Sequence, residues 1–181
     1  MSLRVSFDLG ESDLRHFRLI MREARKAAAN ATPEDIVAGA EQLLERVGEA
    51  AIPQFIQERL DNLELMIRML RDHEWRLPKQ ESARVLNALA YFSEPNDLIP
   101  DHIPGLGFLD DAIMIELVTR ELRHELEAYR DFCDFRARRP AGRGRGADAT
   151  REEWLAERRK ELQSRMRRRR RRNAERPGIF S

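Results

Sequence analysis

The chain has 181 residues, of which 41% are apolar, 36% are charged and only 7% are aromatic. This length suits one domain with an appendage, and this composition favours solvated helices over a sheet protein. The single cysteine excludes an intrachain disulfide, and no apolar run approaches the roughly 20 residues that span a bilayer. The first residues lack the apolar stretch of a secretion signal, so we expect a cytoplasmic protein.

The formal net charge of +1 hides an uneven distribution of charged side chains. Residues 1–136 hold 17 basic and 26 acidic side chains, whereas residues 137–181 hold 16 basic and 6 acidic ones. An acidic body followed by a basic tail indicates either a polyanionic partner or docking of the tail on the body.

Local patterns predict an extended arm followed by two helices. The arm is indicated by alternating apolar residues, namely Leu3, Val5, Phe7 and Leu9. Ser12 is the expected N-cap of a first helix that continues to Ala28. Thr32 is the expected N-cap of the second helix, which has a proline at its first position and Asp35 at its third.

Three further helices follow in the predicted body. Pro53 opens one that ends before Pro78, and its apolar residues have the heptad-like spacing of a helical bundle: Ile56, Leu60, Leu63, Ile67 and Leu70. The next helix is predicted over Ser82–Phe92. The last one begins with two aspartates at Asp110 and continues to about Phe135.

The composition of residues 137–149, rich in glycine and arginine, predicts a linker between a helical body (1–136) and a C-terminal segment (150–181). Thr150 and Glu153 form a capping box at the start of a basic helix. That helix has a sparse apolar stripe of Trp154, Leu155, Leu162 and Met166. The expected fold is therefore an all-α bundle of about five helices with an extended N-terminal arm and a separate basic C-terminal helix.

Residues 90–111 read AYFSEPNDLIPDHIPGLGFLDD and carry the most unusual composition of the body. Prolines disfavour helix and glycines allow positive φ, so this stretch predicts a fixed corner between two helices. Its runs resemble the signature of the YkvA-like family over about residues 83–121: Asp97–Asp101, Ile103–Gly107 and Leu109–Asp111.

This resemblance implies membership of a bacterial domain family of unknown function, which is also appended to some eukaryotic membrane-bound ubiquitin ligases. It implies no activity, substrate or site. Many members continue past the aspartate pair into an apolar, membrane-associated helix. In this chain that helix is interrupted by Glu116, Arg120 and Glu121.

Four aspartates near this corner form a candidate metal site: Asp97, Asp101, Asp110 and Asp111. If the corner folds the first two towards the last two, the carboxylates converge, and such oxygen ligands select Mg²⁺, Ca²⁺ or Mn²⁺. The chain would then be a divalent-cation-binding protein or enzyme. In the alternative interpretation these aspartates cap helices and turns.

The basic tail forms a candidate nucleic-acid site: Arg143, Arg145, Arg165, Arg167, Arg168, Arg169, Arg170, Arg171, Arg172 and Arg176. A phosphate-rich partner would remove the mutual repulsion of these side chains and release counterions. Aromatic residues do not interleave the arginine tract, so the pattern favours contact without sequence readout.

We therefore expect a non-enzymatic binding or adaptor protein that contacts RNA, the ribosome or DNA, since no catalytic set stands out in the sequence. The alternatives are docking of the tail on the acidic body, association of copies through helix faces, and binding to an anionic membrane surface. In the last case the interfacial anchors would be Trp154, Leu155, Ile179 and Phe180.

Overall fold

The computed structural model describes residue 6 and residues 8–48, 51–93, 107–138 and 145–175. Within these ranges the chain is helical and contains no strand, which confirms the all-α prediction. The α-helices are α1 (Glu11–Ala27), α2 (Pro33–Val47), α3 (Gln54–Arg71), α4 (Lys79–Leu89), α5 (Leu109–Glu121), α6 (Arg123–Ala137) and α7 (Arg145–Glu175). Two short 3-10 helices, η1 (Ala28–Asn30) and η2 (Ala90–Ser93), follow α1 and α4.

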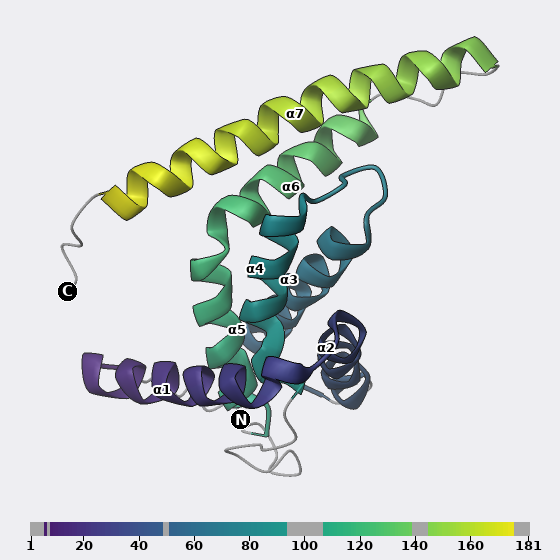
Figure 1. Cartoon of the computed structure of the whole chain (residues 1–181). Helices are drawn as coiled ribbons and strands as arrows, with labels where there is room; N and C mark the ends of the chain where they lie inside the picture. Colours follow the sequence, from purple (N-terminus) through teal and green to yellow (C-terminus); the bar gives the residue numbers. More distant parts are fainter. Residues whose placement is uncertain (1–5, 7, 49–50, 94–106, 139–144, 176–181) are drawn as a thin grey trace.

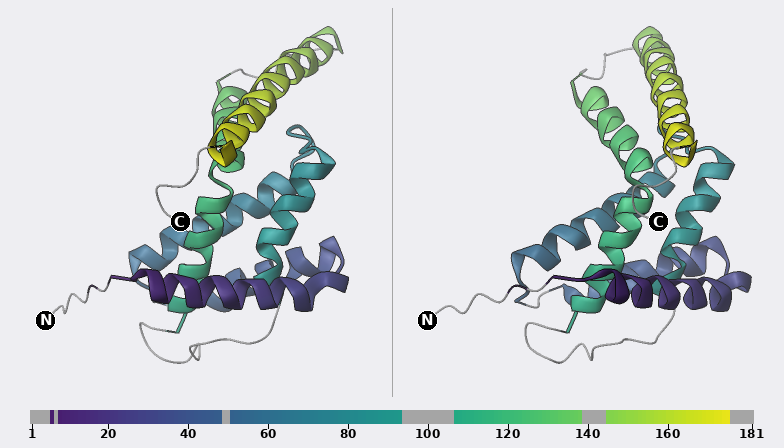
Figure 2. Two further views of the ribbon diagram at one scale, coloured as in Figure 1. Left: turned by 60° about the vertical axis from the view of Figure 1, so that its left-hand side comes forward. Right: turned by 90° about the vertical axis from the view of Figure 1, so that its left-hand side faces the viewer.

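Helices α3, α4 and α5 form the centre of the bundle, with α2 beside them (Figure 1). Helix α1 crosses one end of this group, where it contacts η2. Figure 2 shows α7 at the opposite end, where it lies along α6. The C-terminal helix therefore extends the bundle at the end far from α1.

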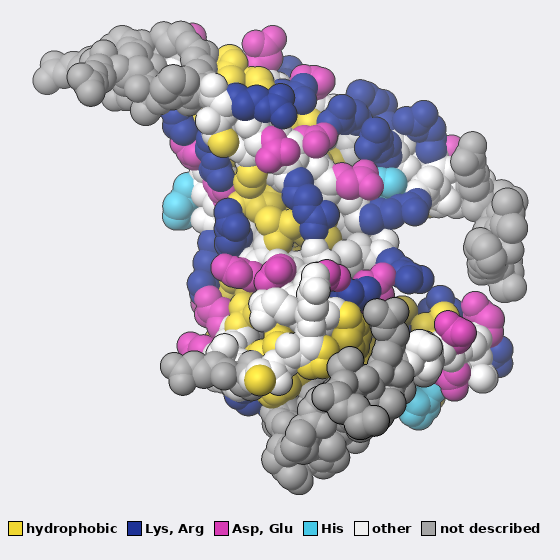
Figure 3. All heavy atoms as spheres, turned by 180° about the vertical axis from the view of Figure 1, so that it is seen from behind, with side chains coloured by type: hydrophobic (Ala, Val, Ile, Leu, Met, Phe, Trp, Pro, Cys, Tyr) yellow, Lys and Arg dark blue, Asp and Glu magenta, His cyan; other side chains and the backbone are white. Residues whose placement is uncertain are grey.

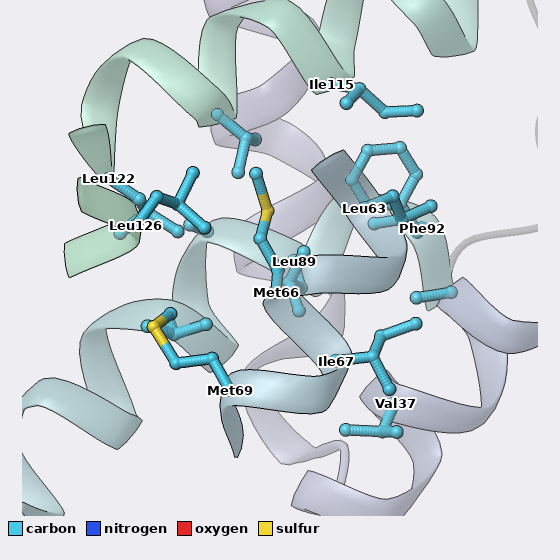
Figure 4. Close-up of a cluster of buried hydrophobic side chains, with 14 of the residues drawn as sticks. Val37, Leu63, Met66, Ile67, Met69, Leu89, Phe92, Ile115, Leu122 and Leu126 are labelled. Carbon is cyan, nitrogen blue, oxygen red and sulfur yellow. The ribbon is translucent and has the colours of Figure 1, made fainter. Parts of the chain in front are cut away.

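The apolar side chains of the body meet in one continuous core. Helix α3 supplies the predicted heptad-like seam, in which four of the five residues are buried and Leu70 is partly buried. Each fully buried side chain of this size contributes about 1.5–3 kcal/mol to the hydrophobic stabilisation. Figure 4 shows Val37, Leu63, Met66, Ile67, Met69, Leu89, Phe92, Ile115, Leu122 and Leu126 in this core.

The starts of α1 and α2 test two predicted N-caps. At α2 the predicted N-cap is confirmed, because the Asp35 N–H donates to Thr32 Oγ1 at 3.1 Å. The Thr32 N–H donates to the Asp35 carboxylate at 3.1 Å in return, which completes a capping box. At α1 the prediction is wrong, because the helix begins one residue before Ser12. Gly10 is the N-cap there, and its N–H donates to the Asp13 carboxylate at 2.9 Å.

The predicted fifth helix is in fact two helices, α5 and α6, separated at the buried Leu122. At this break the Arg84 side chain donates to the Glu121 backbone carbonyl at 3.1 Å and to the Glu125 carboxylate at 3.1 Å. A side chain that inserts into the backbone ladder bends a helix. The contact from α4 therefore accounts for the break.

Two predicted elements lie largely outside the described residues. These are the extended N-terminal arm, of which residues 1–5 and 7 are not described, and the corner over residues 94–106. Helix α7 begins at Arg145, so Thr150 lies within a helix and is not its N-cap.

Candidate polyanion-binding site

Helix α7 docks on the body through a narrow apolar stripe. Leu155, Leu162 and Met166 are exposed by 1% or less, and their spacing of seven and four residues places them on one helical face. Trp154 stacks on Phe135 of α6 with a ring-centroid distance of 3.8 Å. The sparse stripe predicted from the sequence is confirmed. Because it covers only one face, the arginines around it divide between the body and the solvent.

The turn between α3 and α4 anchors the first half of α7. Gln163 Nε2 donates to the Trp75 carbonyl at 2.9 Å, and Arg159 donates to the Glu74 carbonyl at 2.6 Å. The Glu74 carboxylate also accepts a hydrogen bond from Arg151, which lowers the pKa of Glu74. These directional contacts fix how far α7 lies along its axis and which side of it faces the body.

The same turn is held to α6 by a hydrogen-bonded carboxylate. Tyr129 Oη donates to Asp72 at 2.8 Å, and Arg136 lies 2.9 Å from Asp72 and 2.8 Å from Glu74. Burial acts to raise the pKa of Asp72. Hydrogen bonds from Tyr129 and the Trp75 N–H, with the charge of Arg136, outweigh this effect and lower that pKa. Asp72 is therefore ionised at neutral pH.

Two buried carboxylates hold the second half of α7. Glu125 is fully buried and accepts from Arg84 at 3.1 Å and from Arg170 at 3.0 Å. Glu81 is 1% exposed and lies 3.6 Å from Arg170 and 3.7 Å from Arg167. A buried carboxylate is costly without charged partners, so these two direct Arg167 and Arg170 towards the body.

Two further arginines of α7 form pairs on its exposed flank. Arg165 lies 2.6 Å from Asp131, and Arg169 lies 3.1 Å from Glu127, with all four side chains at least a third exposed. Exposed ion pairs of this kind contribute about 0–1 kcal/mol and are screened by salt. These two arginines are consequently available to a stronger anionic partner.

The remaining arginines of the tract, Arg168, Arg171 and Arg172, are exposed and form no ion pair with any residue that the structure describes. Figure 3 shows basic side chains gathered over the C-terminal part of α7. We use the term arginine face for the residues that do not reach a buried carboxylate: Arg165, Arg168, Arg169, Arg171 and Arg172. At 1.5 Å per residue this face extends about 10 Å along the helix.

The other predicted phosphate-binding arginines are Arg143 and Arg176, which lie outside the described residues, and Arg145, which begins α7. Two proposed membrane anchors are occupied in packing instead. Trp154 stacks on the body and Leu155 is fully buried. The other two, Ile179 and Phe180, lie outside the described residues.

The predicted metal ligands divide in the same way. Asp97 and Asp101 lie outside the described residues, whereas Asp110 and Asp111 are buried in the first turn of α5, at 1% and 3% exposure. This is the position in which a carboxylate interacts favourably with a helix N-terminus. Where the structure is described, no three His, Cys, Asp or Glu side chains form a group that could hold a metal ion.

Sequence reasoning missed the two buried carboxylates that orient α7. A signal was present for Glu125, which lies next to Leu126 and three residues after Leu122 on the core-facing side of its helix. Glu81 is likewise four residues before the buried Val85. An acidic residue at a core position indicates a buried basic partner, and the arginine tract of the tail supplies one.

Comparisons with known proteins assign part of the body of the chain to a family. Residues 83–117, which include most of α4 and the first part of α5, match the model of a family described as protein of unknown function, DUF1232. The "uncharacterized membrane protein YkvA" of Bacillus subtilis (strain 168) is 36% identical over 76 residues, which are 39% of this chain and 70% of that protein. This chain belongs to the YkvA-like family. No solved structure matches the chain significantly.

The residues of this YkvA-like protein that match the family model cover part of the body and do not include α7. The name of the Bacillus relative calls it a membrane protein. In the described part of this YkvA-like chain, none of the helices combines the length and the apolar character that crossing a bilayer requires.

Proposed function

We propose that this YkvA-like protein binds a nucleic acid, RNA or DNA, through the arginine face of α7. The observation that supports this most strongly is the division of the tract. Arg167 and Arg170 are directed to buried glutamates, which orients the helix, while Arg168, Arg171 and Arg172 are exposed without an ion pair among the described residues. The body thereby holds α7 so that a row of arginine side chains faces the solvent.

The positive charges of this row repel one another when no anionic partner is bound. Like charges three or four residues apart on a helix repel each other, and Arg168 has such neighbours in Arg171 and Arg172. A phosphate backbone would remove this repulsion and release counterions. Guanidinium groups also bind phosphate oxygens bidentately, which a lysine cannot do.

The salt dependence of binding measures how many arginines engage the partner. For a single strand, the logarithm of the binding constant falls with the logarithm of salt concentration with a slope of about −0.7 per neutralised phosphate. If only Arg168, Arg171 and Arg172 engage phosphates, the slope is about −2. If Arg165 and Arg169 leave their exposed partners and join them, it is about −3.5.

The test is fluorescence anisotropy with a labelled single-stranded RNA of mixed sequence, titrated with the full chain between about 50 and 200 mM salt. The variant Arg168→Ala/Arg171→Ala removes two exposed charges, so the slope should become shallower by about 1.4. The matched control is Arg15→Ala/Arg18→Ala, which removes two exposed arginines from α1. Equal slopes for the two variants would refute binding through the arginine face.

A second candidate, peripheral binding to an anionic membrane, is favoured by the name of the Bacillus relative. The arginine face would then attract anionic lipid, at about 1 kcal/mol per arginine near the surface. Sedimentation of the full chain with vesicles of phosphatidylserine and phosphatidylcholine tests this. Binding that is lost in Arg168→Ala/Arg171→Ala, together with weak RNA binding, would favour the membrane over nucleic acid.

A further inference from the structure

A depression of about 510 Å³ opens where the first turn of α6 faces the last turns of α7. It is lined by Arg123, His124, Arg169, Arg172, Asn173 and Glu175. Three guanidinium groups against one carboxylate give this lining a formal charge of +2. The depression lies at the C-terminal end of the arginine face, because Arg169 and Arg172 belong to both.

His124 is held between the two helices in a defined state. Its Nε2 lies 3.3 Å from Arg123 Nε and 2.8 Å from Asn173 Nδ2. Arg123 can only donate, so Nε2 is an acceptor and the proton of the neutral ring is on Nδ1. That Nδ1 is buried and has no hydrogen-bond partner among the described residues.

The surroundings of His124 favour its neutral form. Burial, followed by the charge of Arg123, lowers the pKa of His124, with a smaller contribution from Arg169. Glu127 and Glu125 oppose these effects. The ring therefore adds no charge to the depression at neutral pH, and its acceptor nitrogen occupies donors of Arg123 and Asn173 that an incoming anion could use.

We infer that this depression binds the terminal phosphate monoester of a nucleic-acid strand that lies along the arginine face. Arg123, through its Nη groups, and Arg172 supply charged donors from two helices, and the second N–H of Asn173 Nδ2 supplies a neutral one. Arg169 contributes to the +2 lining only when it leaves its exposed partner Glu127. A phosphate monoester carries about −1.5 to −2 charges at neutral pH, which then balances the lining better than the single charge of an internal phosphodiester. This inference rests on the proposed nucleic-acid function and specifies which end group that partner carries.

The first test compares three labelled RNAs of one sequence, with a 5′-phosphate, a 3′-phosphate or hydroxyl groups at both ends. One charge-assisted hydrogen bond corresponds to about tenfold in affinity, so one phosphorylated RNA should bind about tenfold more tightly than the hydroxyl form. Arg123→Ala and Asn173→Ala should abolish this preference. The control Arg130→Ala removes an exposed arginine seven residues further along α6, outside the depression, and should leave it unchanged.

The second test follows the histidine ring resonances by NMR while inorganic phosphate is added to the full chain. The His124 signal should shift and that of the exposed His16 should not, and Arg123→Ala should suppress the shift. Equal movement of both histidines would overturn the site. Equal affinity for the three RNAs would also overturn the site. If RNA binding is nevertheless lost in Arg168→Ala/Arg171→Ala, the proposed nucleic-acid function still stands. Failure of all three RNAs to bind, with a selective His124 shift, would refute the nucleic-acid function and retain the phosphate site.

Discussion

Two arginines that are neighbours in sequence are expected to differ strongly in their contribution to stability. Arg170 donates to the fully buried Glu125 at 3.0 Å and lies 3.6 Å from the buried Glu81. Arg169 lies 3.1 Å from Glu127, and both partners are about half exposed. The variants Arg170→Ala and Arg169→Ala remove the same charge from the same helix and relieve similar repulsion, so their difference isolates the buried contact.

The contacts of the two arginines determine how much their loss of stability should differ. Removing one partner of a buried pair costs about 3–5 kcal/mol when the other charge is left alone. Here Glu125 keeps Arg84 and Glu81 keeps Arg167, so the loss is closer to that of one hydrogen bond to a charged group, about 2 kcal/mol. An exposed pair such as the one formed by Arg169 lies in the range of about 0–1 kcal/mol, with a middle value of about 0.5 kcal/mol.

Urea denaturation followed by circular dichroism measures both values, and thermal melting gives a second readout. For a chain of this length 1 kcal/mol shifts the melting temperature by about 2–4 °C, so Arg170→Ala should melt about 4–8 °C below the wild type. Arg169→Ala should melt within about 2 °C of it. Similar losses in the two variants would show that Arg170 is not the arginine that faces the buried glutamates. The orientation of α7 described above would then be wrong.

Three further substitutions and one control variant, all followed by urea denaturation, test the packing of the body, the docking of α7 and the electrostatics of the body. Gly39→Ala places a Cβ 2.6 Å from the Phe92 carbonyl oxygen, so it should lower the free energy of unfolding by about 1–3 kcal/mol. The control Gly10→Ala, whose Cβ would have no neighbouring atom closer than 3.6 Å, should lower it less. Equal losses in the two variants would contradict close contact between α2 and η2. Leu162→Ala should cost about 2–5 kcal/mol because that side chain is fully buried, and a loss below about 0.5 kcal/mol would mean that α7 is not docked. Asp72 has a lowered pKa in the folded protein, so its contribution is present above its unfolded pKa of about 4 and is lost as pH falls through the folded value. Asp72→Asn should therefore lower the urea midpoint at pH 7 and have little effect in strong acid, and a pH-independent difference would contradict the ionised carboxylate.

Two features of the fold that depend only on neighbouring residues were predicted correctly from the sequence. The Thr32 N-cap needs only a backbone N–H three residues away, and the seam of α3 follows from its own periodicity. The break at Leu122 depends instead on Arg84, which is 37 residues from the carbonyl that it reaches. No local pattern contains that contact, so the sequence favoured one continuous helix.

In the candidate site, too, local features were predictable from the sequence and features set by distant contacts were not. Composition identifies the arginine tract as a unit, but it cannot assign individual side chains, because the assignment depends on the rotation of α7 about its axis. That rotation is set by Gln163 at the Trp75 carbonyl and by Glu125 beneath Arg170. Once it is known, adjacent residues such as Arg170 and Arg171 have opposite roles.

The stacking of Trp154 on Phe135 has a consequence for YkvA-like proteins as a group. Helix α7 lies outside the residues that match the family model, yet it covers an aromatic surface of α6. A homologue that ends after the counterpart of α6 would expose this ring, unless the counterpart of Phe135 is polar or is buried against something else, such as lipid or another subunit. The residue type at this position is then one indication of whether a family member covers this part of α6 by itself or against a companion.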